Sequence, residues 1–273
     1  MKKVFAIICV LALAVALVGC GAAEQAEVAK DYSQSVEGAA VVAEAGSAGE
    51  ELATTEEFFA AANFTPVDSM AKALMEVEAG TADIAIVDYV TSIGTIGEGT
   101  YFVDLKVVEG KDFSPEEYGI AFRKGSDATA AVNEAIAELM ADGTMDKIGA
   151  DYKLDQLLIK EGKANEEEVT EGDLAYIKEK GKMTIGMTLF APMNYYDDNK
   201  ELIGFETEFA KAVCEKLGVE AEFVEINWDT KEIELNAKSI DCIWNGMTIT
   251  EERLANMSIS VPYMQNKQVM VAK

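Results

Sequence analysis

The chain has 273 residues, enough for one large or two modest domains, and its apolar content of 49% is enough to build hydrophobic cores. The formal net charge of −26 makes nucleic acids and anionic membrane surfaces poor partners. The chain contains no histidine, which excludes a Ser-His-Asp triad, a Cys-His pair and a His-ligated zinc site. We expect no metal and no cofactor.

The N-terminus has the features of a targeting segment. Two lysines precede an apolar run at residues 4–18, which is short for a membrane span. The run ends in Leu-Val-Gly-Cys at residues 17–20, the pattern of a bacterial lipoprotein cleavage box. We therefore predict a signal peptide at 1–19, a lipid on Cys20 that anchors the protein to the cell membrane from outside the cytoplasm, and a polar tether at 20–35.

Two further cysteines lie in the part of the chain expected to fold. Cys214 and Cys242 both have apolar neighbours, which favours buried free thiols. A disulfide between them is the alternative, because the protein is expected outside the cytoplasm. The sequence does not supply the Cα separation that a disulfide requires.

The first half of the chain alternates strand-like apolar runs with helix-like segments. We predict strands at 39–44, 83–87, 101–108 and 117–123, with a short strand at Val67, and helices at 68–78, 128–140 and 145–152. Ser47 and Glu50 fit a reciprocal capping box, which predicts a helix that begins there. The free N–H groups of such a helix start attract a carboxylate, although a plain strand-to-helix turn is the alternative.

Asp88 directly follows the buried strand predicted at 83–87. Open α/β sheets place ligand-binding groups at the carboxyl ends of their strands. Asp88 is therefore a candidate partner for an ammonium group. The alternative is that it caps a helix that starts near Thr91.

A charged stretch at 160–172 contains almost no apolar residue and is predicted as a linker. Its run of glutamates indicates a solvated spacer rather than a calcium site. After it, we predict strands at 183–187, 221–225, 239–244 and 267–271 and helices at 174–180, 205–217 and 231–236. Strands and helices alternate in both halves without an internal sequence repeat, which predicts an α/β fold of sheets flanked by helices.

The segment 245–253, Asn-Gly-Met-Thr-Ile-Thr-Glu-Glu-Arg, follows a strand-like run and has the makings of a carboxylate site. Gly246 lets a ligand approach the backbone because it has no Cβ. Thr248 offers a hydroxyl, and Thr250 is a plausible N-cap. Arg253 offers a planar fork of donors that matches a carboxylate. The alternative is an ordinary loop with a solvated arginine.

Residues 204–217, Gly-Phe-Glu-Thr-Glu-Phe-Ala-Lys-Ala-Val-Cys-Glu-Lys-Leu, match the signature of the family 3 extracellular solute-binding proteins at every constrained position. Residues 246–253 resemble the carboxylate-binding loop of that family, and 118–126 resemble its strand returning from the second lobe. The resemblance covers nearly all of 36–273. It implies a two-lobed periplasmic-binding-protein fold of type II, with the ligand cleft between the lobes.

The order of the matching pieces is reversed relative to that family, so the chain resembles a circular permutant. We predict lobe 2 at 36–117 and lobe 1 at 118–273, with the linker 160–172 joining the family's original chain ends, which lie close in space. A single covalent crossing near 116–118 would then remain, and the other would be rebuilt from the chain end near Lys273, lying beside residues 31–38. We expect this arrangement to loosen hinge closure. A monomer is expected, with domain swapping between two chains as the alternative.

The resemblance also implies roles for individual residues. Arg253 would bind the α-carboxylate of an amino acid with help from Thr248 and the backbone at Gly246, and Asp88 would bind the α-ammonium. Further implied contacts are backbone donors at Ser47 and Ala48, aromatic walls at Phe190 and Trp228, and positions facing the ligand side chain at Glu44, Thr188 and Asn245. Trp228 as plain core is the alternative for that residue.

The function implied is that of an extracytoplasmic receptor, which binds a free L-amino acid and delivers it to the permease of an ABC importer. A dehydratase of the cyclohexadienyl or arogenate type on the same fold is one alternative, which Glu44 keeps open, and a ligand-sensing module is another. We expect no enzyme, because the amino-acid contacts are intact and histidine is missing. Glu44 would favour a donor-bearing or cationic side chain on the ligand, whereas Phe190 and Trp228 would suit a flat or apolar one.

Overall fold

The computed structural model describes residues 30–164 and 168–273. The predicted signal peptide at 1–19 and the lipidated Cys20 lie outside the described residues, as does most of the predicted tether. The helices and strands of the described residues lie in one compact unit, Tyr32–Lys273. Within the described part of the chain, every helix is too short or too polar to cross a membrane.

One sheet of this unit has its strands in the order β2-β1-β3-β13-β4, and β5 pairs with β13 beyond that path. The first three strands run parallel to one another, and β13 runs antiparallel to β3. The strands are β1 (Ala40–Glu44), β2 (Asn63–Val67), β3 (Ile84–Asp88), β4 (Lys106–Val107), β5 (Pro115–Tyr118) and β13 (Met264–Ala272). We call this sheet and its helices α1 (Ala48–Thr55), α2 (Met70–Ala79) and α3 (Tyr89–Thr95) lobe 2.

Successive residues of the lobe 2 strands enter two different cores, as the two-residue repeat of a strand requires. In β1, Val42 packs on one side with Leu74 of α2, whereas Val41 and Ala43 pack on the other side with Ala53 of α1. Strands β3 and β13 divide their residues in the same way. Both faces of the sheet are covered, which explains why the runs at 40–43, 84–87 and 269–272 are apolar without alternating polar residues.

The second sheet has the order β10-β7-β11-β6-β12. Its strands are β6 (Ala121–Arg123), β7 (Lys182–Met187), β10 (Glu220–Glu225), β11 (Cys242–Ile243) and β12 (Met257–Ile259). Together with α4 (Ala128–Ala141), α5 (Thr144–Asp151), α6 (Asp173–Lys180), α7 (Phe205–Leu217), α8 (Lys231–Asn236) and α9 (Glu251–Asn256), it forms lobe 1. A short hairpin of β8 (Tyr195–Tyr196) and β9 (Leu202–Ile203) precedes α7.

The two sheets share one topology, although the sequence shows no repeat. In each, three parallel strands are followed by one antiparallel strand, β13 or β6, and then by a short fifth strand. The fold prediction of two α/β lobes is therefore confirmed. Cys214 and Cys242 lie buried in the main core of lobe 1 and are both free thiols, as predicted.

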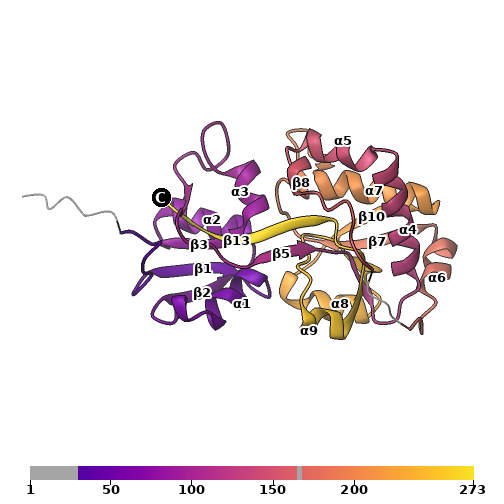
Figure 1. Cartoon of the computed structure of the whole chain (residues 1–273), viewed down its shortest axis with the longest axis horizontal. Helices are drawn as coiled ribbons and strands as arrows, with labels where there is room; N and C mark the ends of the chain where they lie inside the picture. The colour runs from indigo at the N-terminus through magenta and orange to yellow at the C-terminus, as the bar shows by residue number, and fades with distance from the viewer. Residues whose placement is uncertain (1–29, 165–167) are drawn as a thin grey trace, which may run out of the picture. The chain divides into compact units, whose positions relative to one another are not determined.

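Two strands cross between the lobes, which corrects the expected single crossing (Figure 1). β5 leaves lobe 2 and leads into β6 of lobe 1, while β13 starts beside β5, with Met264 opposite Tyr118. β13 then continues into lobe 2, with Gln268 opposite Asp88 of β3. Because β13 is nine residues long, it reaches both partners. The last strand of the range predicted as lobe 1 thus lies in the sheet of lobe 2, and the reason given for a looser hinge is wrong.

Element positions otherwise follow the predictions closely, with helices α4, α7 and α8 within one residue of the expected ends. The strand expected at 101–108 is only two residues long, and the strand expected at 117–123 is divided into β5 and β6. Each segment forms a strand only over the residues that pair with a neighbouring strand. Residues 106–107 and 115–118 pair with β13, and residues 121–122 pair with β11.

Candidate functional site

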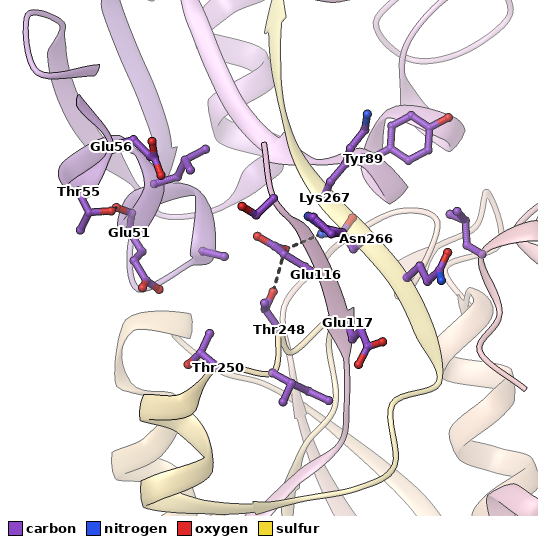
Figure 2. Close-up of a pocket in the computed structure, with 17 residues that line it drawn as sticks. Glu51, Thr55, Glu56, Tyr89, Glu116, Glu117, Thr248, Thr250, Asn266 and Lys267 are labelled. Atoms are coloured by element: carbon purple, nitrogen blue, oxygen red, sulfur yellow. Dashed lines mark hydrogen bonds between the residues drawn. The ribbon is translucent and has the colours of Figure 1, made fainter. Parts of the chain in front are cut away.

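A cavity of about 840 Å³ lies where the two crossing strands meet the start of α1 and the loop before α9 (Figure 2). Its wall includes Ala48 of α1, Glu116 of β5, Thr248 and Thr250 ahead of α9, and Asn266 of β13. Both lobes and both crossing strands therefore contribute side chains. The structure brings the predicted carboxylate-binding loop and the predicted helix start to the same cavity.

Arg253 does not line this cavity itself, but its own helix and the lining residue Thr248 hold it next to the wall. The hydroxyl of Thr250 accepts a hydrogen bond from the Arg253 backbone N–H at 3.2 Å, so Thr250 is the N-cap of α9, as predicted. The Arg253 side chain is 8% exposed. Its Nη1 donates to the Thr248 carbonyl at 2.8 Å, and its Nη2 donates to the carbonyl of Gly46 in lobe 2 at 3.4 Å. The arginine is thus a buried cation that touches both lobes.

Asp88 is 3% exposed and does not cap α3 through its side chain. Its Oδ1 instead accepts hydrogen bonds from Asn266 Nδ2 at 2.6 Å and Gln268 Nε2 at 2.5 Å, both on β13. Burial, together with the nearby Glu116 carboxyl, raises the pKa of Asp88 to about 7. The Asp88 carboxyl is therefore poised to bind a cation, which would restore its charged form.

A chain of hydrogen bonds joins Asp88 to Arg253. Glu116 Oε2 accepts from the same two amides as Asp88, at 2.9 Å from Asn266 and 3.0 Å from Gln268. Glu116 Oε2 also accepts from the Thr248 hydroxyl at 3.2 Å, and the Thr248 carbonyl binds Arg253 (Figure 2). The candidate anion-binding and cation-binding residues, which are 165 positions apart in the sequence, therefore belong to one network.

The start of α1 completes the cavity from lobe 2. Ser47 Oγ accepts from the Glu50 N–H at 3.2 Å, and the Glu50 carboxylate accepts from the Gly46 N–H at 2.7 Å. The predicted capping box is present, except that the Glu50 carboxylate accepts from the N–H of Gly46, one residue before the N-cap, instead of from the N–H of Ser47. The Ser47 N–H donates to the Glu44 carbonyl, and the Glu50 and Glu51 N–H groups are bonded to Ser47, which leaves the N–H groups of Ala48 and Gly49 as donors for a carboxylate.

Gly246 plays a different part from the one expected. Its N–H donates to both carboxylate oxygens of the buried Glu206 at 2.9 and 3.2 Å, so that donor is not open to a ligand. Its φ of +57° is in the left-handed region, and a Cβ there would lie 2.5 Å from the Phe190 ring. Glu206 also accepts from the Tyr263 hydroxyl, and burial raises the pKa of Glu206 to about 7. Gly246 therefore shapes the loop rather than binding a carboxylate.

The two predicted aromatic walls are both buried in lobe 1. Phe190 packs against Gly246, and Trp228 lies below Lys231, whose Nζ is 4.9 Å from the ring centre. Lys231 Nζ also donates to the carbonyls of Trp228 at 3.1 Å and Gly46 at 2.9 Å. Burial, together with the nearby Arg253, lowers the pKa of Lys231 to about 8.

Of the three residues predicted to face the ligand side chain, Thr188 and Asn245 are bonded within lobe 1, whereas Glu44 is not. Thr188 and Asn245 bond to each other, because Asn245 Oδ1 accepts from the Thr188 N–H at 3.0 Å and from its hydroxyl at 2.8 Å. Asn245 Nδ2 donates to Asn194 Oδ1, so its polar atoms hold lobe 1 together. Glu44 is 2% exposed, and its Oε1 has no hydrogen-bond partner among the described residues. Burial raises the pKa of Glu44 to about 8, with the Asp88 charge adding to the shift.

Several residues of the site were not expected from the sequence. Glu116 and Tyr118 share one face of β5, and Asn266 and Gln268 share one face of β13. The sequence carried only a weak signal for the second pair, because the polar run at 265–268 precedes the apolar end of the strand and does not show which of its residues face the site. Lys231 had no such signal. Among the described residues, no group of three histidines, cysteines or carboxylates is placed to hold a metal ion.

Comparison with known proteins supplies a family for one part of the chain. Residues 183–273 match the sequence model of the bacterial extracellular solute-binding proteins, family 3. The L-cystine-binding protein TcyJ of Escherichia coli (strain K12) is 36% identical over 105 residues, 38% of this chain and 40% of that protein. The ABC transporter arginine-binding protein 1 of the same organism is 31% identical over 93 residues, 34% of this chain and 38% of that protein. The chain therefore spans about two fifths of the length of these curated relatives.

Solved structures of related proteins were also found. The arginine-bound form of domain 1 from TmArgBP is 32% identical, with a TM-score of 0.32, over 36% of this chain and 84% of that one. The ancestral amino acid-binding protein AncCDT-1, described as a precursor of cyclohexadienyl dehydratase, is 34% identical, with a TM-score of 0.29, over 30% of this chain and 37% of that one. Residues 183–273 are thus the part of this chain that is similar in sequence to the bacterial extracellular solute-binding proteins, family 3.

Proposed function

We propose that this protein is the extracytoplasmic binding component of an amino-acid ABC importer and that it binds a free L-amino acid in the cavity between its lobes. Arg253 of lobe 1 binds the α-carboxylate, with the Thr248 hydroxyl and the N–H groups at the start of α1 as further donors. Asp88 of lobe 2 binds the α-ammonium. The observation that carries this proposal is that a buried arginine and a buried aspartate lie on one hydrogen-bond network at the 840 Å³ cavity.

The electrostatics of a zwitterion support this arrangement. A buried amino acid must have both of its charges paired, because an unpaired charge in a closed site costs several kcal/mol. One lobe supplies the cation and the other supplies the anion, so ligand binding and closure of the lobes favour each other. Gly46 fits a closed arrangement, since a Cβ there would lie 2.9 Å from Asp229 Cα of lobe 1.

The relatives support the substrate class and the partners. Proteins similar to this chain are named for binding cystine and arginine, and one is named as part of an ABC transporter. We extend this to a permease partner and to binding without catalysis. The apolar run before Cys20 supports a lipid anchor on the outer side of the cell membrane. Mass spectrometry of the protein purified from a bacterial membrane tests the anchor, and a cytoplasmic protein that keeps residues 1–19 would refute it.

The chain order supports circular permutation within a monomer. The family match falls at the C-terminal end of the chain, and Val36 ahead of β1 shares a core with Met270 of β13. A chain rejoined from Lys273 to Asp31 and reopened within 160–172 is expected to fold and to bind the same amino acid. Light scattering over a hundredfold range of concentration is expected to give one monomer mass, whereas a concentration-dependent dimer would favour domain swapping.

Thermal unfolding with the twenty standard L-amino acids and L-cystine as probes tests the function. At 100 times the dissociation constant, a bound probe stabilises the protein by about 2.7 kcal/mol, which raises the unfolding temperature by several degrees. We expect at least one probe to do so at one molecule per chain and to be recovered unchanged. A panel without any stabilising probe contradicts the function, and conversion of the probe favours the dehydratase alternative.

A further inference from the structure

Glu116 lies at the centre of the site, although the resemblance to the family 3 solute-binding proteins implied no role for it. It belongs to crossing strand β5, is half-buried, and lines the cavity. Figure 2 shows it between Thr248 and Asn266, whereas the carboxylate of Glu117, which also lines the cavity, lies on the other side of β5. Glu116 is therefore open to a ligand from one side and held by protein donors on the other.

Glu116 and Asp88 share the same two donors, the side-chain amides of Asn266 and Gln268. Asn266 Nδ2 lies 2.6 Å from Asp88 Oδ1 and 2.9 Å from Glu116 Oε2, so these two oxygens are at most about 5.5 Å apart, the sum of the two distances. Gln268 Nε2 bridges the same oxygens at 2.5 and 3.0 Å. Each amide nitrogen has only two N–H bonds, and both are used. Neutral amides orient the two carboxyls but supply no full positive charge to separate them.

Other buried groups around this pair also lack a regular partner. The Tyr118 hydroxyl is fully buried beside Asp88 and Glu116, and its interaction with the Asp88 carboxyl falls short of regular hydrogen-bond geometry. Glu44 Oε1, which is near Asp88, has no hydrogen-bond partner among the described residues. Buried polar atoms without regular partners are rare, and two of them beside an 840 Å³ cavity indicate a place for a donor-rich ligand group. A primary ammonium, with three N–H donors and a positive charge, fits this place.

We infer that Glu116 and Asp88 together form a two-carboxylate ammonium site, which holds one proton when empty and releases it to solvent when the amino acid binds. The inference rests on the proposed function, since it deepens the account of how the amino acid is bound. In the step itself, one carboxyl O–H bond breaks, its proton goes to water, and the ligand ammonium replaces it between the two carboxylates. No other bond changes.

The direction of the pH effect follows from the groups around the pair. Burial raises the pKa of both Asp88 and Glu116, and their mutual repulsion raises that of Asp88 further. The other titratable or charged groups that face the pair are Glu44 from β1, Tyr118 from β5, Arg253 from α9 and Tyr263 ahead of β13. An ammonium opposes protonation of the pair, so proton release occurs below a pH of about 7 and affinity falls there by about tenfold per pH unit.

Isothermal titration in buffers of different ionisation enthalpy measures the protons released per molecule bound. The probe is the amino acid of the panel above that stabilises the wild-type protein most, used at pH 6 and pH 8. We expect the wild type to release about one proton at pH 6 and few at pH 8. Glu116→Gln is expected to abolish most of the release at pH 6 and to weaken binding at pH 8 by about tenfold, the loss of one charge-assisted hydrogen bond.

Matched variants separate this inference from a structural effect and from the function itself. Glu117→Gln, next to it on the same strand, removes an exposed carboxylate and is expected to behave as the wild type. Glu116→Asp keeps a carboxyl group and is expected to keep the proton release, whereas Asp88→Asn is expected to lose it. These two variants test the inference even if the Glu116→Gln chain does not fold. Undiminished proton release and affinity in Glu116→Gln would overturn the inference alone. A wild type that binds no amino acid would overturn the proposed function first.

Discussion

Replacement of Arg253 by alanine removes the only arginine that reaches both lobes at the cavity, within the described residues. Its side chain is 8% exposed, so the ligand carboxylate that it is proposed to bind would be left as a buried, unpaired charge. Truncating one partner of such a pair costs about 2–5 kcal/mol. This corresponds to a dissociation constant raised roughly 30-fold to several thousand-fold.

Titration calorimetry with the stabilising amino acid measures this loss directly. Arg253→Lys is the matched control, because it keeps the charge but loses the two-point fork, and it is expected to lie between the wild type and Arg253→Ala. The unliganded Arg253→Ala chain loses the 2.8 Å bond to the Thr248 carbonyl, which is worth about 1 kcal/mol in unfolding free energy. An Arg253→Ala protein that folds and binds the amino acid within threefold of the wild-type affinity would refute the assignment.

Three further predictions concern stability. Gly246→Ala is expected to lower the unfolding free energy by about 1–3 kcal/mol more than Gly218→Ala, as measured by urea unfolding. Both glycines have positive φ, but only at Gly246 would the added Cβ lie 2.5 Å from an aromatic ring, that of Phe190. Because burial raises the pKa of Glu206 to about 7 from 4.5, its stabilising effect is complete below pH 4.5 and is lost as pH rises to about 7. The unliganded wild type should therefore lose more stability between pH 5 and pH 8 than Glu206→Gln, and equal losses would contradict this. Asp173→Ala leaves Arg123 buried without its 3.0 Å ion pair and is expected to cost about 3–5 kcal/mol in urea unfolding, while a loss below 1 kcal/mol would show the pair to be dispensable.

Local chemistry made much of the site predictable. The capping hydroxyls of Ser47 and Thr250 act within three residues along the chain, so the sequence alone specified both helix starts. The position of Arg253 then followed from the N-cap, because a helix fixes which way its first turn faces. Asp88 was predictable for a similar reason, as the end of a buried strand in an α/β sheet is defined by the apolar run before it.

The remaining features depend on contacts between distant parts of the chain. Glu116 acquires its role from Asn266 and Gln268, about 150 residues later, once β5 and β13 pair. Nothing near Gly246 in the sequence indicates that its N–H is bonded to Glu206, 40 residues earlier. For the same reason, the sequence did not show that β13 itself passes from lobe 1 into lobe 2. Strand pairing is non-local, and a run of apolar residues does not specify which sheet it joins.

Recognition of both ends of a zwitterion by opposite lobes is the central claim, and ligand analogues test it most directly. The amino acid that stabilises the protein, its carboxamide and its N-acetyl derivative are titrated against the same wild-type protein by calorimetry. The carboxamide removes the charge that Arg253 pairs, and the N-acetyl group removes the charge that Asp88 pairs. We predict that each analogue binds at least 30-fold more weakly than the free amino acid, because each leaves one buried charge of the protein without its partner. If either analogue binds as tightly as the free amino acid, the corresponding lobe does not recognise that end of the ligand and the account is contradicted.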